Sequence, residues 1–370
     1  MSTTNPSVHT RKTPIMDRID LFSVGIKYLD IRDNPSKMTG LIEALWLNQT
    51  GLNTIPSMIR EQVEAATVYP LDDNLFTTEY HLSKEEALLE FARLQIMLKQ
   101  ASEYKEHSHA EYAWNIALSQ VFEVAFKRAY YTIRAEDTTS ATIAPKLAHE
   151  FSSLATTINY NSNGALYKMV DWCLTIEPKD REGIRQICDC APEGLGTFNQ
   201  STYPPLRHTA ISVAVVTKTE TAASTGEPQL SIWTKAWLDR MCQLRGLPIN
   251  TDPGAPPLPL LRIRGDDWYV LFAYYESTGN PNQSQQQGNG SSSQAADSSR
   301  PKLVLLSELP IGGTRHIWDA YKLLKSLRFI ANWAEDEFRR YIDDVVVPDA
   351  IKNFVRRDTA SVGSNGQREI

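Results

Sequence analysis

The sequence predicts an α/β (α+β) protein in which a helical N-terminal layer precedes a core of strands and helices. Amphipathic segments with helical periodicity dominate the N-terminal part, and near-continuous apolar segments rich in β-branched residues follow them. Hydrophobic residues make up 42% of the chain and charged residues 22%, as expected of a protein that buries a core. With 370 residues, the chain is long enough for two domains or for one large domain with insertions.

The N-terminal layer is expected to consist of helices. Residues 57–67 have helical character, and Ser83 followed by Glu86 fits a capping box at the start of a longer amphipathic helix. A further helix is expected at about 108–131, because one set of residues recurs there at helical spacing on a single face. The members of this face are Glu111, Asn115, Leu118, Phe122 and Ala125.

Strands are expected from the middle of the chain onward. Residues 166–177 alternate in polarity, and residues 210–216 form the near-continuous apolar run of a strand buried on both faces. A helix is expected at 229–244, and the closing segment 316–346 predicts a long helix with a continuous apolar stripe. The stripe consists of Ala320, Leu324, Leu327, Ala331, Ala334 and Phe338. The remaining predicted strands are 260–263, 268–275 and 303–306.

Composition divides the chain into five segments. Residues 1–14 are polar and are expected to form a disordered tail, and residues 15–107 form the mostly helical region. The main domain is expected at 108–346. Within it, residues 277–300 are Ser, Gln, Asn and Gly-rich, so we expect a disordered insertion there. Residues 347–370 are expected to form a C-terminal tail.

Charge, cysteine content and hydropathy exclude several classes of protein. Lys and Arg number 38 and Asp and Glu 44, so the net charge is −6 and any nucleic-acid contact needs a local basic patch. The four cysteines are too few for a disulfide scaffold and lack zinc-site spacing, so we expect reduced thiols. No segment has the apolar length of a membrane span or a secretory signal. We therefore expect a soluble, cytoplasmic protein that does not bind membranes.

Four polar residues stand where chemistry is expected. Asp171 lies within a predicted apolar strand, and Lys218 ends the next one. Glu111 lies on the inner face of a predicted helix, and Gln229 begins the helix that follows Lys218. Two carboxylates, a lysine and a glutamine gathered at one sheet edge would suit Mg²⁺ and a phosphodiester. The alternative is a buried Asp–Lys pair with unrelated surface groups, since a buried carboxylate needs a partner.

Several short motifs follow one another in a fixed order between Glu111 and Tyr341. They are EYAWN at 111–115, KMVD at 168–171, YPPLR at 203–207, TK at 217–218, QLSIW at 229–233, GDDW at 265–268, IGGT at 311–314, LR at 327–328 and Trp333. Their order and spacing resemble the fungal PD-(D/E)XK nuclease-like domain family, and most of all its arginine-containing cyclodipeptide synthase branch. The resemblance implies a PD-(D/E)XK nuclease-like core with a central mixed sheet flanked by helices.

The chain departs from the nuclease pattern at two places. The pattern requires an acid two residues before the lysine, and Val216 stands there. The pattern also has a histidine soon after Asn115, which is replaced by Ile116, Ala117 and Leu118. Because a hard cation needs charged oxygen ligands, we expect that no metal and no other cofactor is used. Compensating coordination by Glu111 or Glu220 is the alternative.

The synthase resemblance implies an enzyme of natural-product biosynthesis that joins aminoacyl groups from arginyl-tRNA and a second aminoacyl-tRNA into a cyclic dipeptide (2,5-diketopiperazine). Such chemistry needs a base, an oxyanion partner and, for a covalent intermediate, a nucleophile. The catalytic candidates are Asp171, Lys218, Glu111, Thr217 and Ser212. Carboxylates for the arginine side chain and aromatic or amide pocket walls give the substrate-binding candidates Glu220, Gln229, Asp267, Trp233 and Tyr203. An ordinary core or solvated role remains open for each.

Transfer RNA needs basic surface. The tRNA-binding candidates on or beside the closing helix are Arg315, Lys322, Lys325 and Arg328, and an ordinary solvated helix face is the alternative. No obligate protein partner is expected. Two other functions remain open at this point: a Mg²⁺-dependent PD-(D/E)XK nuclease with a rearranged acid, and a catalytically inactive nucleic-acid-binding module.

Overall fold

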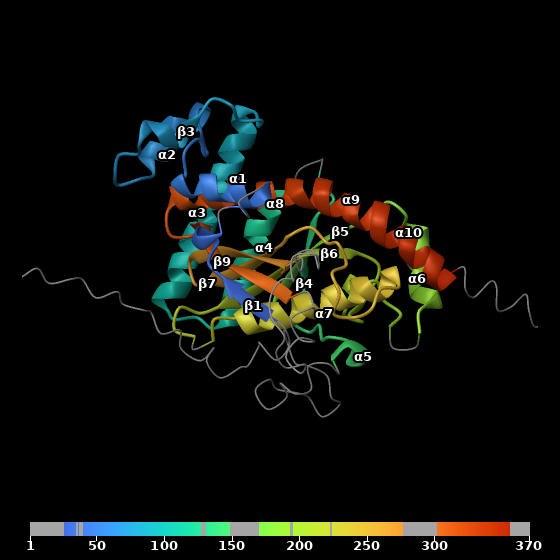
Figure 1. The fold of residues 1–370 in the computed structure, drawn as a ribbon. Coiled ribbons are helices and arrows are strands. Elements are labelled where there is room, and N and C mark those ends of the chain that lie inside the picture. The colour runs from blue at the N-terminus through green and yellow to red at the C-terminus, as the bar shows by residue number, and fades with distance from the viewer. Residues whose placement is uncertain are drawn as a thin grey trace, which may run out of the picture.

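A seven-stranded mixed sheet forms the centre of the computed structural model, which describes residues 26–34, 36, 40–126, 131–148, 170–192, 195–222, 224–276 and 302–355 (Figure 1). The strand order is β1-β9-β8-β7-β6-β5-β4. β6 runs parallel to β7 and antiparallel to β5. The strands are β1 (Ile26–Leu29), β4 (Arg134–Asp137), β5 (Trp172–Ile176), β6 (Ala210–Lys218), β7 (Leu258–Arg264), β8 (Asp267–Glu276) and β9 (Lys302–Gly313).

Helices cover both faces of this sheet (Figure 1). On one face α4 (Glu111–Phe126) contacts β6 and α8 (Ile317–Trp333) contacts β9, and α3 (Lys84–Glu106) packs against both helices. α7 (Glu227–Arg245) covers the other face and contacts β6. Every residue of β6 is consequently buried, which explains the near-continuous apolar sequence of that strand.

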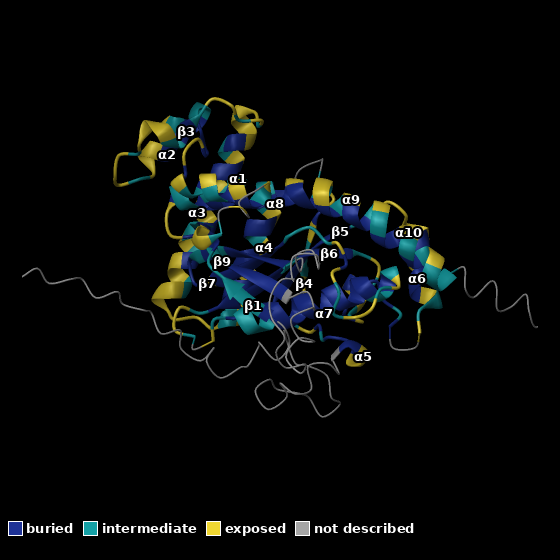
Figure 2. Ribbon diagram, in the orientation of Figure 1, coloured by how far each residue is buried: buried dark blue, intermediate teal, exposed yellow. Residues whose placement is uncertain are grey.

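α7 is enclosed along almost its whole length, as its dark colour in Figure 2 indicates. Polar contacts fix its first turns to the sheet: the hydroxyls of Tyr28 and Ser231 lie 2.9 Å apart, and Arg262 of β7 pairs with Glu227 at 3.3 Å. α7 therefore ties the edge strand β1 and the central strand β7 to one layer.

The N-terminal region adds a small unit and one strand of the main sheet. α1 (Leu41–Leu47), α2 (Arg60–Ala65) and the two-stranded parallel pair of β2 (Ile55–Pro56) and β3 (Phe76–Thr77) form the small unit. β1 pairs in parallel with β9, so the region expected to be mostly helical also supplies an edge strand. The other short helices are α5 (Pro145–Ala148), α6 (Arg181–Cys190), α9 (Arg339–Tyr341) and α10 (Val347–Ala350).

Local sequence signals predict several elements correctly. Ser83 caps α3 and Glu86 bonds back to the Ser83 N–H at 2.9 Å, so the capping box is confirmed. The apolar stripe of the closing helix is buried at all six predicted positions. The predicted fold class, helices flanking a mixed sheet, is also confirmed.

Other expectations differ from the structure. Asp171 was expected inside a strand, but β5 begins at Trp172, and residues 166–169 lie outside the described part of the chain. The segment expected to be a C-terminal tail from 347 starts as helix, because α10 and the π-helical turn Ile351–Val355 continue the closing helix. The predicted N-terminal tail and the insertion at 277–300 lie outside the described residues, and the domain boundaries stay predictions.

Two further sequence predictions concern membrane-spanning helices and the four cysteines. Among the helices that the structure describes, none combines the length and the apolar character needed to cross a bilayer. None of the four cysteines forms a disulfide in the structure, and burial raises the pKa of the Cys188 thiol to about 11. The expectation that the thiols are reduced stays a prediction.

A buried ion pair joins the N-terminal helix layer to the closing helix. Arg328 of α8 pairs with Glu90 of α3, and both side chains are almost fully buried. Tyr80 completes the network, because its hydroxyl donates to Glu90 at 2.6 Å and accepts from Arg328 at 2.7 Å. This network satisfies charges that would otherwise be costly to bury.

We expect Arg328→Leu to lower the free energy of unfolding by about 3–5 kcal/mol, because Glu90 would then be a buried charge without its partner. The double variant Arg328→Leu with Glu90→Leu removes both charges and is expected to lose much less. Urea denaturation followed by circular dichroism measures both values. A single variant as stable as the unsubstituted chain would contradict the role given to this pair.

Candidate active site

Asp171 lies at the bend that leads into β5, and only 1% of its surface is exposed. Its backbone N–H donates to the Val215 carbonyl at 2.9 Å, which attaches this bend to β6. The Thr217 backbone N–H donates to Asp171 Oδ2 at 2.7 Å, and Asn115 Nδ2 donates to Oδ1 at 3.4 Å. Hydrogen bonds from donors on two different elements hold the carboxylate in one orientation and offset the cost of burying it.

Lys218 is the last residue of β6, and its ammonium lies 3.4 Å from the Glu111 carboxylate. The lysine side chain is 11% exposed and the glutamate side chain 30% exposed. The pair is therefore partly shielded from water but open on the side of Glu111. Such a pair can hold and transfer a proton while remaining accessible to a substrate.

Asp171 and Lys218 converge on the same surface of α4. Glu111, which pairs with Lys218, and Asn115, which bonds Asp171, are four residues apart and therefore adjacent on one helix face. The helix face predicted from the sequence thus places its polar residues at the ends of β5 and β6. This convergence joins an aspartate, a lysine and a glutamate in one partly open site.

Val216 occupies the strand position that precedes Lys218 on β6 by two residues, and it is 1% exposed. Its methyl groups pack against Gly226, the residue before α7: a Cβ atom on Gly226 would lie 2.7 Å from Val216 Cγ1. Gly226 also has a positive φ of 82°, which favours glycine. The start of α7 is therefore fitted to a hydrocarbon side chain at position 216.

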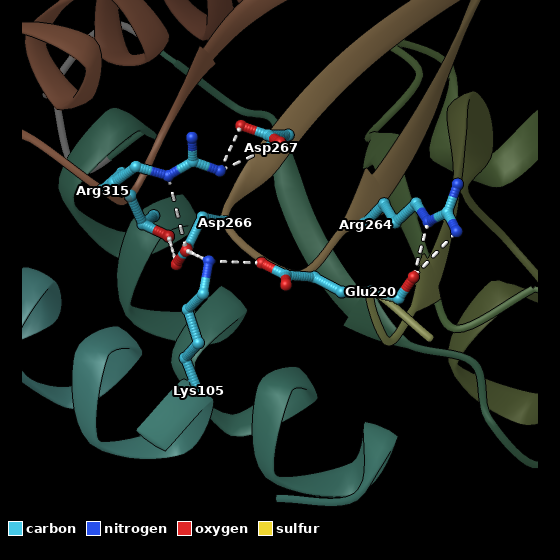
Figure 3. Close-up of polar contacts among 7 residues, drawn as sticks. Lys105, Glu220, Arg264, Asp266, Asp267 and Arg315 are labelled. Atoms are coloured by element: carbon cyan, nitrogen blue, oxygen red, sulfur yellow. Dashed lines mark hydrogen bonds and ion pairs between the residues drawn. The ribbon is translucent and has the colours of Figure 1, made fainter. Parts of the chain in front are cut away.

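A cluster of charged residues adjoins this site at the turn between β7 and β8 (Figure 3). The turn is attached to the end of β6, because the Gly265 N–H donates to the Lys218 carbonyl at 2.9 Å. Lys105, near the end of α3, contacts Glu220 at 2.6 Å and the buried carboxylate of Asp266 at 3.1 Å. These hydrogen bonds, with that to Glu220 the largest cause, raise the pKa of the Lys105 ammonium above its usual value.

Two arginines complete the charged cluster (Figure 3). Arg315 contacts Asp267 at 3.2 Å, and its Nε lies 3.8 Å from Asp266. The exposed Arg264 donates to the Glu220 backbone carbonyl at 2.7 Å. Cations from α3, β7 and the start of α8 therefore surround carboxylates at the ends of β6 and β8.

Lys105 is the residue that sequence reasoning missed. It stands at the end of a long amphipathic helix, more than a hundred residues from both of its acidic partners in the chain. A lysine in the last turn of a helix is ordinary, so its position carried no signal. Only the packing of α3 against the rest of the helix layer brings it to the site.

The other predicted site residues either lie apart from the Lys218–Glu111 pair or are buried beside it. Ser212 donates its hydroxyl to the Leu174 carbonyl at 3.0 Å and is roughly 20 Å from Lys218 along the extended strand. Tyr203 precedes the opposite end of β6, and Trp233 is buried within α7. Thr217 is fully buried beside Lys218, and its hydroxyl has no hydrogen-bond partner among the described residues. The buried Oε1 of Gln229 likewise has none there.

The four basic residues predicted to bind tRNA do not form one open surface. Lys322 donates to the Gln49 carbonyl at 3.2 Å, and Lys325 donates to the carbonyls of Leu52 and Asn53 at 3.3 Å. Arg328, the fourth tRNA-binding candidate, is buried against Glu90 and offers little charge to the surface. Arg315 alone of the four lies in the charged cluster, where it is about half exposed.

Comparison with known proteins assigns the family. A family model of the PD-(D/E)XK nuclease superfamily matches residues 62–339, which is most of the chain. The chain belongs to the PD-(D/E)XK nuclease superfamily. Searches of curated proteins and of solved structures gave no match. The matched range includes the helices α3, α4, α7 and α8 and every site residue described above.

A divalent metal held by two carboxylates is what the PD-(D/E)XK pattern implies. Here Asp171 supplies one carboxylate, both oxygens of which already accept hydrogen bonds, and Val216 supplies only methyl groups. Glu111 is paired with Lys218, and Glu220 with Lys105. Within the described ranges no three His, Cys, Asp or Glu side chains are grouped to hold a metal. This donor set does not fit a tightly held Mg²⁺ ion.

We expect millimolar Mg²⁺ or Mn²⁺ to leave the melting temperature of the protein unchanged, because only a ligand that binds the folded state stabilises it. Val216→Asp restores an acid on the strand, and Mn²⁺ is expected to raise the melting temperature of that variant. Differential scanning fluorimetry with and without EDTA measures both. A metal-dependent rise in the unsubstituted chain would show that its residues do hold the ion.

Proposed function

We propose that this superfamily member is an aminoacyl-tRNA-dependent cyclodipeptide synthase that forms an arginine-containing 2,5-diketopiperazine. One observation supports the proposal: Asp171, Lys218 and Glu111, which the resemblance assigns to nuclease-site positions, meet at one face of α4, while Val216, packed against Gly226, stands where the nuclease pattern has an acid. The retained groups suit proton transfer without a metal.

The proposed reaction needs no activation step. The free α-amine of one aminoacyl-tRNA attacks the ester carbonyl of the other and a C–N bond forms. The C–O bond of the attacked ester breaks, and its ribose oxygen takes up the proton as that tRNA leaves. The new terminal α-amine then attacks the remaining ester, which closes the ring and releases the second tRNA. Two esters yield one cyclic dipeptide and two tRNAs, with no oxidant or cofactor. Positioning and proton transfer are the tasks left to the protein.

Lys218 and Glu111 are proposed to carry the proton. Glu111 is partly exposed, so it can take up the proton that the attacking α-amine loses as the C–N bond forms, and Lys218 can stabilise the negative charge on the ester oxygen. Asp171 orients the end of β6 through the Thr217 N–H. The Ser212 hydroxyl is committed to Leu174, so the proposal uses direct aminolysis without a covalent intermediate.

Glu220 and Asp266 are proposed to recognise the arginine side chain. Both carboxylates contact the single ammonium of Lys105, at 2.6 and 3.1 Å, so they lie close enough together to bracket one cation. A guanidinium presents several planar N–H donors to such a pair, which favours arginine over other amino acids. Lys105 is about half exposed and can withdraw when the substrate cation enters.

Purified protein supplied with charged tRNAs is expected to release an arginine-containing cyclic dipeptide, detected by mass spectrometry. Lys218→Ala is expected to lower the rate at least about a hundredfold, as loss of a proton-transfer group does. Lys27→Ala is the matched control, because Lys27 is also a strand lysine paired with a glutamate at 3.4 Å but lies on the edge strand β1. That variant should keep full activity.

Absence of any cyclic dipeptide from folded protein would overturn the proposal, as would full activity of Lys218→Ala. Activity that disappears with EDTA would point instead to metal-dependent chemistry.

The arginine site gives a separate prediction. Glu220→Gln is expected to raise KM for arginyl-tRNA about tenfold while KM for the second aminoacyl-tRNA stays constant, since a charge-assisted contact to the guanidinium is lost. Glu103→Gln, which changes another ion-paired glutamate close by near the end of α3, serves as control. Equal changes in both KM values would rule out Glu220 as the arginine-binding carboxylate.

Two other functions remain as outcomes of these tests. Membership of the nuclease superfamily favours a nuclease with a rearranged acid, which would cleave DNA or RNA only with Mg²⁺ or Mn²⁺. A nucleic-acid-binding module without catalysis would bind RNA in a salt-sensitive manner and yield neither product.

A further inference from the structure

A cavity of about 480 Å³ lies between α8 and the segment that carries β2 and β3. Lys325, Arg328 and Phe329 of α8 form one wall, and Tyr80 and His81 form another. Arg315, at the charged cluster, precedes Lys325 by roughly ten residues, or about 15 Å of helix. The cavity is thus at the opposite end of the helix layer, and its size is typical of small-molecule sites.

Lys325 places a positive charge in this wall. Its ammonium contacts only the carbonyls of Leu52 and Asn53, both at 3.3 Å, and no acidic side chain in the described part of the chain lies within ion-pair distance. Partial burial lowers the pKa of this ammonium, because the charged form has lost part of its water. An anion in the cavity would supply the missing countercharge.

Arg328 presents a second donor. Its guanidinium is buried and its charge is balanced by Glu90, but its Nε–H has no acceptor among the described residues. A buried donor without an acceptor is costly, and a polar ligand or water in the adjoining cavity would satisfy it. The Nε–H of Arg328 therefore indicates a polar occupant, and the Arg328–Glu90 pair holds this wall of the cavity in place.

Aromatic rings provide the remaining surface. Tyr80 and His81 stack with centroids 5.2 Å apart, and the Phe329 ring centroid lies 5.9 Å from the Lys325 ammonium. Tyr131 also lines the cavity and donates its hydroxyl to Asn332 at 2.9 Å. Rings beside a cation are the arrangement with which proteins bind a nucleobase and its phosphate.

We propose that this cavity binds a nucleotide, with the phosphate against Lys325 and the base against the rings of Phe329 and Tyr80. Among the described residues of the lining, Glu79 alone is acidic, so we place its carboxylate against an amino group of the base rather than against the phosphate. The nucleotide is either free or the end of a single-stranded RNA. The site does not depend on the function proposed for Lys218.

Isothermal titration calorimetry with AMP, UMP and a short single-stranded RNA ending in adenosine tests this site on the full chain. We expect saturable binding of AMP or of the RNA, with UMP weaker because it lacks an amino group on its base. Lys325→Ala is expected to weaken binding about tenfold or more. Lys99→Ala is the control, because Lys99 is a helix lysine of α3 that lies 3.9 Å from Glu103 and does not line the cavity.

The outcomes of this experiment distinguish a free nucleotide from an RNA end and can overturn the proposal. Binding of AMP alone identifies a free nucleotide as the ligand, and RNA binding that AMP competes away identifies an RNA end. No binding of either probe overturns the proposal, as does RNA binding that neither AMP nor Lys325→Ala reduces. Phe329→Leu provides a second variant that keeps an apolar side chain and removes the ring, and it is expected to weaken binding even if Lys325→Ala fails to fold. UMP binding as tight as AMP binding would overturn the assignment of Glu79.

Discussion

The antiparallel pairing of β5 with β6 is the constraint on which the rest of the active site depends. It brings the bend at Asp171 beside the end of β6, where the Thr217 N–H fixes the carboxylate. The same pairing leaves Lys218 as the last strand residue, so its long side chain reaches α4. Without this register the aspartate and the lysine would be separate polar residues at two strand ends.

Charged residues from the helix layer meet the strand ends in two different ways. Near Lys218 the cluster is half open, and its ion pairs involve side chains with substantial exposure, as Lys105 and Arg315 have. At the other end of the layer, Arg328 and Glu90 are sealed between α8 and α3. Exposed pairs contribute little to stability and exchange partners readily, whereas a sealed pair holds its elements together. The end of the helix layer near Lys218 is therefore suited to binding and releasing a ligand, whereas the Arg328–Glu90 pair at the other end holds α8 and α3 together.

Local patterns predicted most of the elements, and contacts distant in sequence account for the errors. The capping box at Ser83 and the buried face of α4 depend on residues within a few positions, so their signals are complete in the sequence. The sequence singles out Asp171 as a carboxylate within a predicted apolar strand and Lys218 as the end of the next strand, and the motif order supports both. Lys105 and the burial of Arg328 depend on how helices far apart in the chain pack, which no local pattern encodes.

The candidate site was predicted in part for the same reason. Residues on β6 or just after it, such as Lys218 and Glu220, lie near one another by chain continuity, and the roles expected of them stay predictions. Ser212 lies on the same strand as Lys218. Because a strand is extended, the six positions from Ser212 to Lys218 keep the two side chains far apart. Membership of one element is therefore weaker grounds for proximity in a strand than in a helix.

The parallel pairing of β1 with β9 has a consequence for the integrity of the sheet. β1 occupies the outer edge along Leu303, Val304, Leu305 and Leu306, four consecutive buried apolar residues. Loss of β1 by proteolysis would leave a hydrophobic row with unpaired peptide groups, which is a template for intermolecular strand addition. By pairing with this edge, the short strand β1 prevents such intermolecular strand addition.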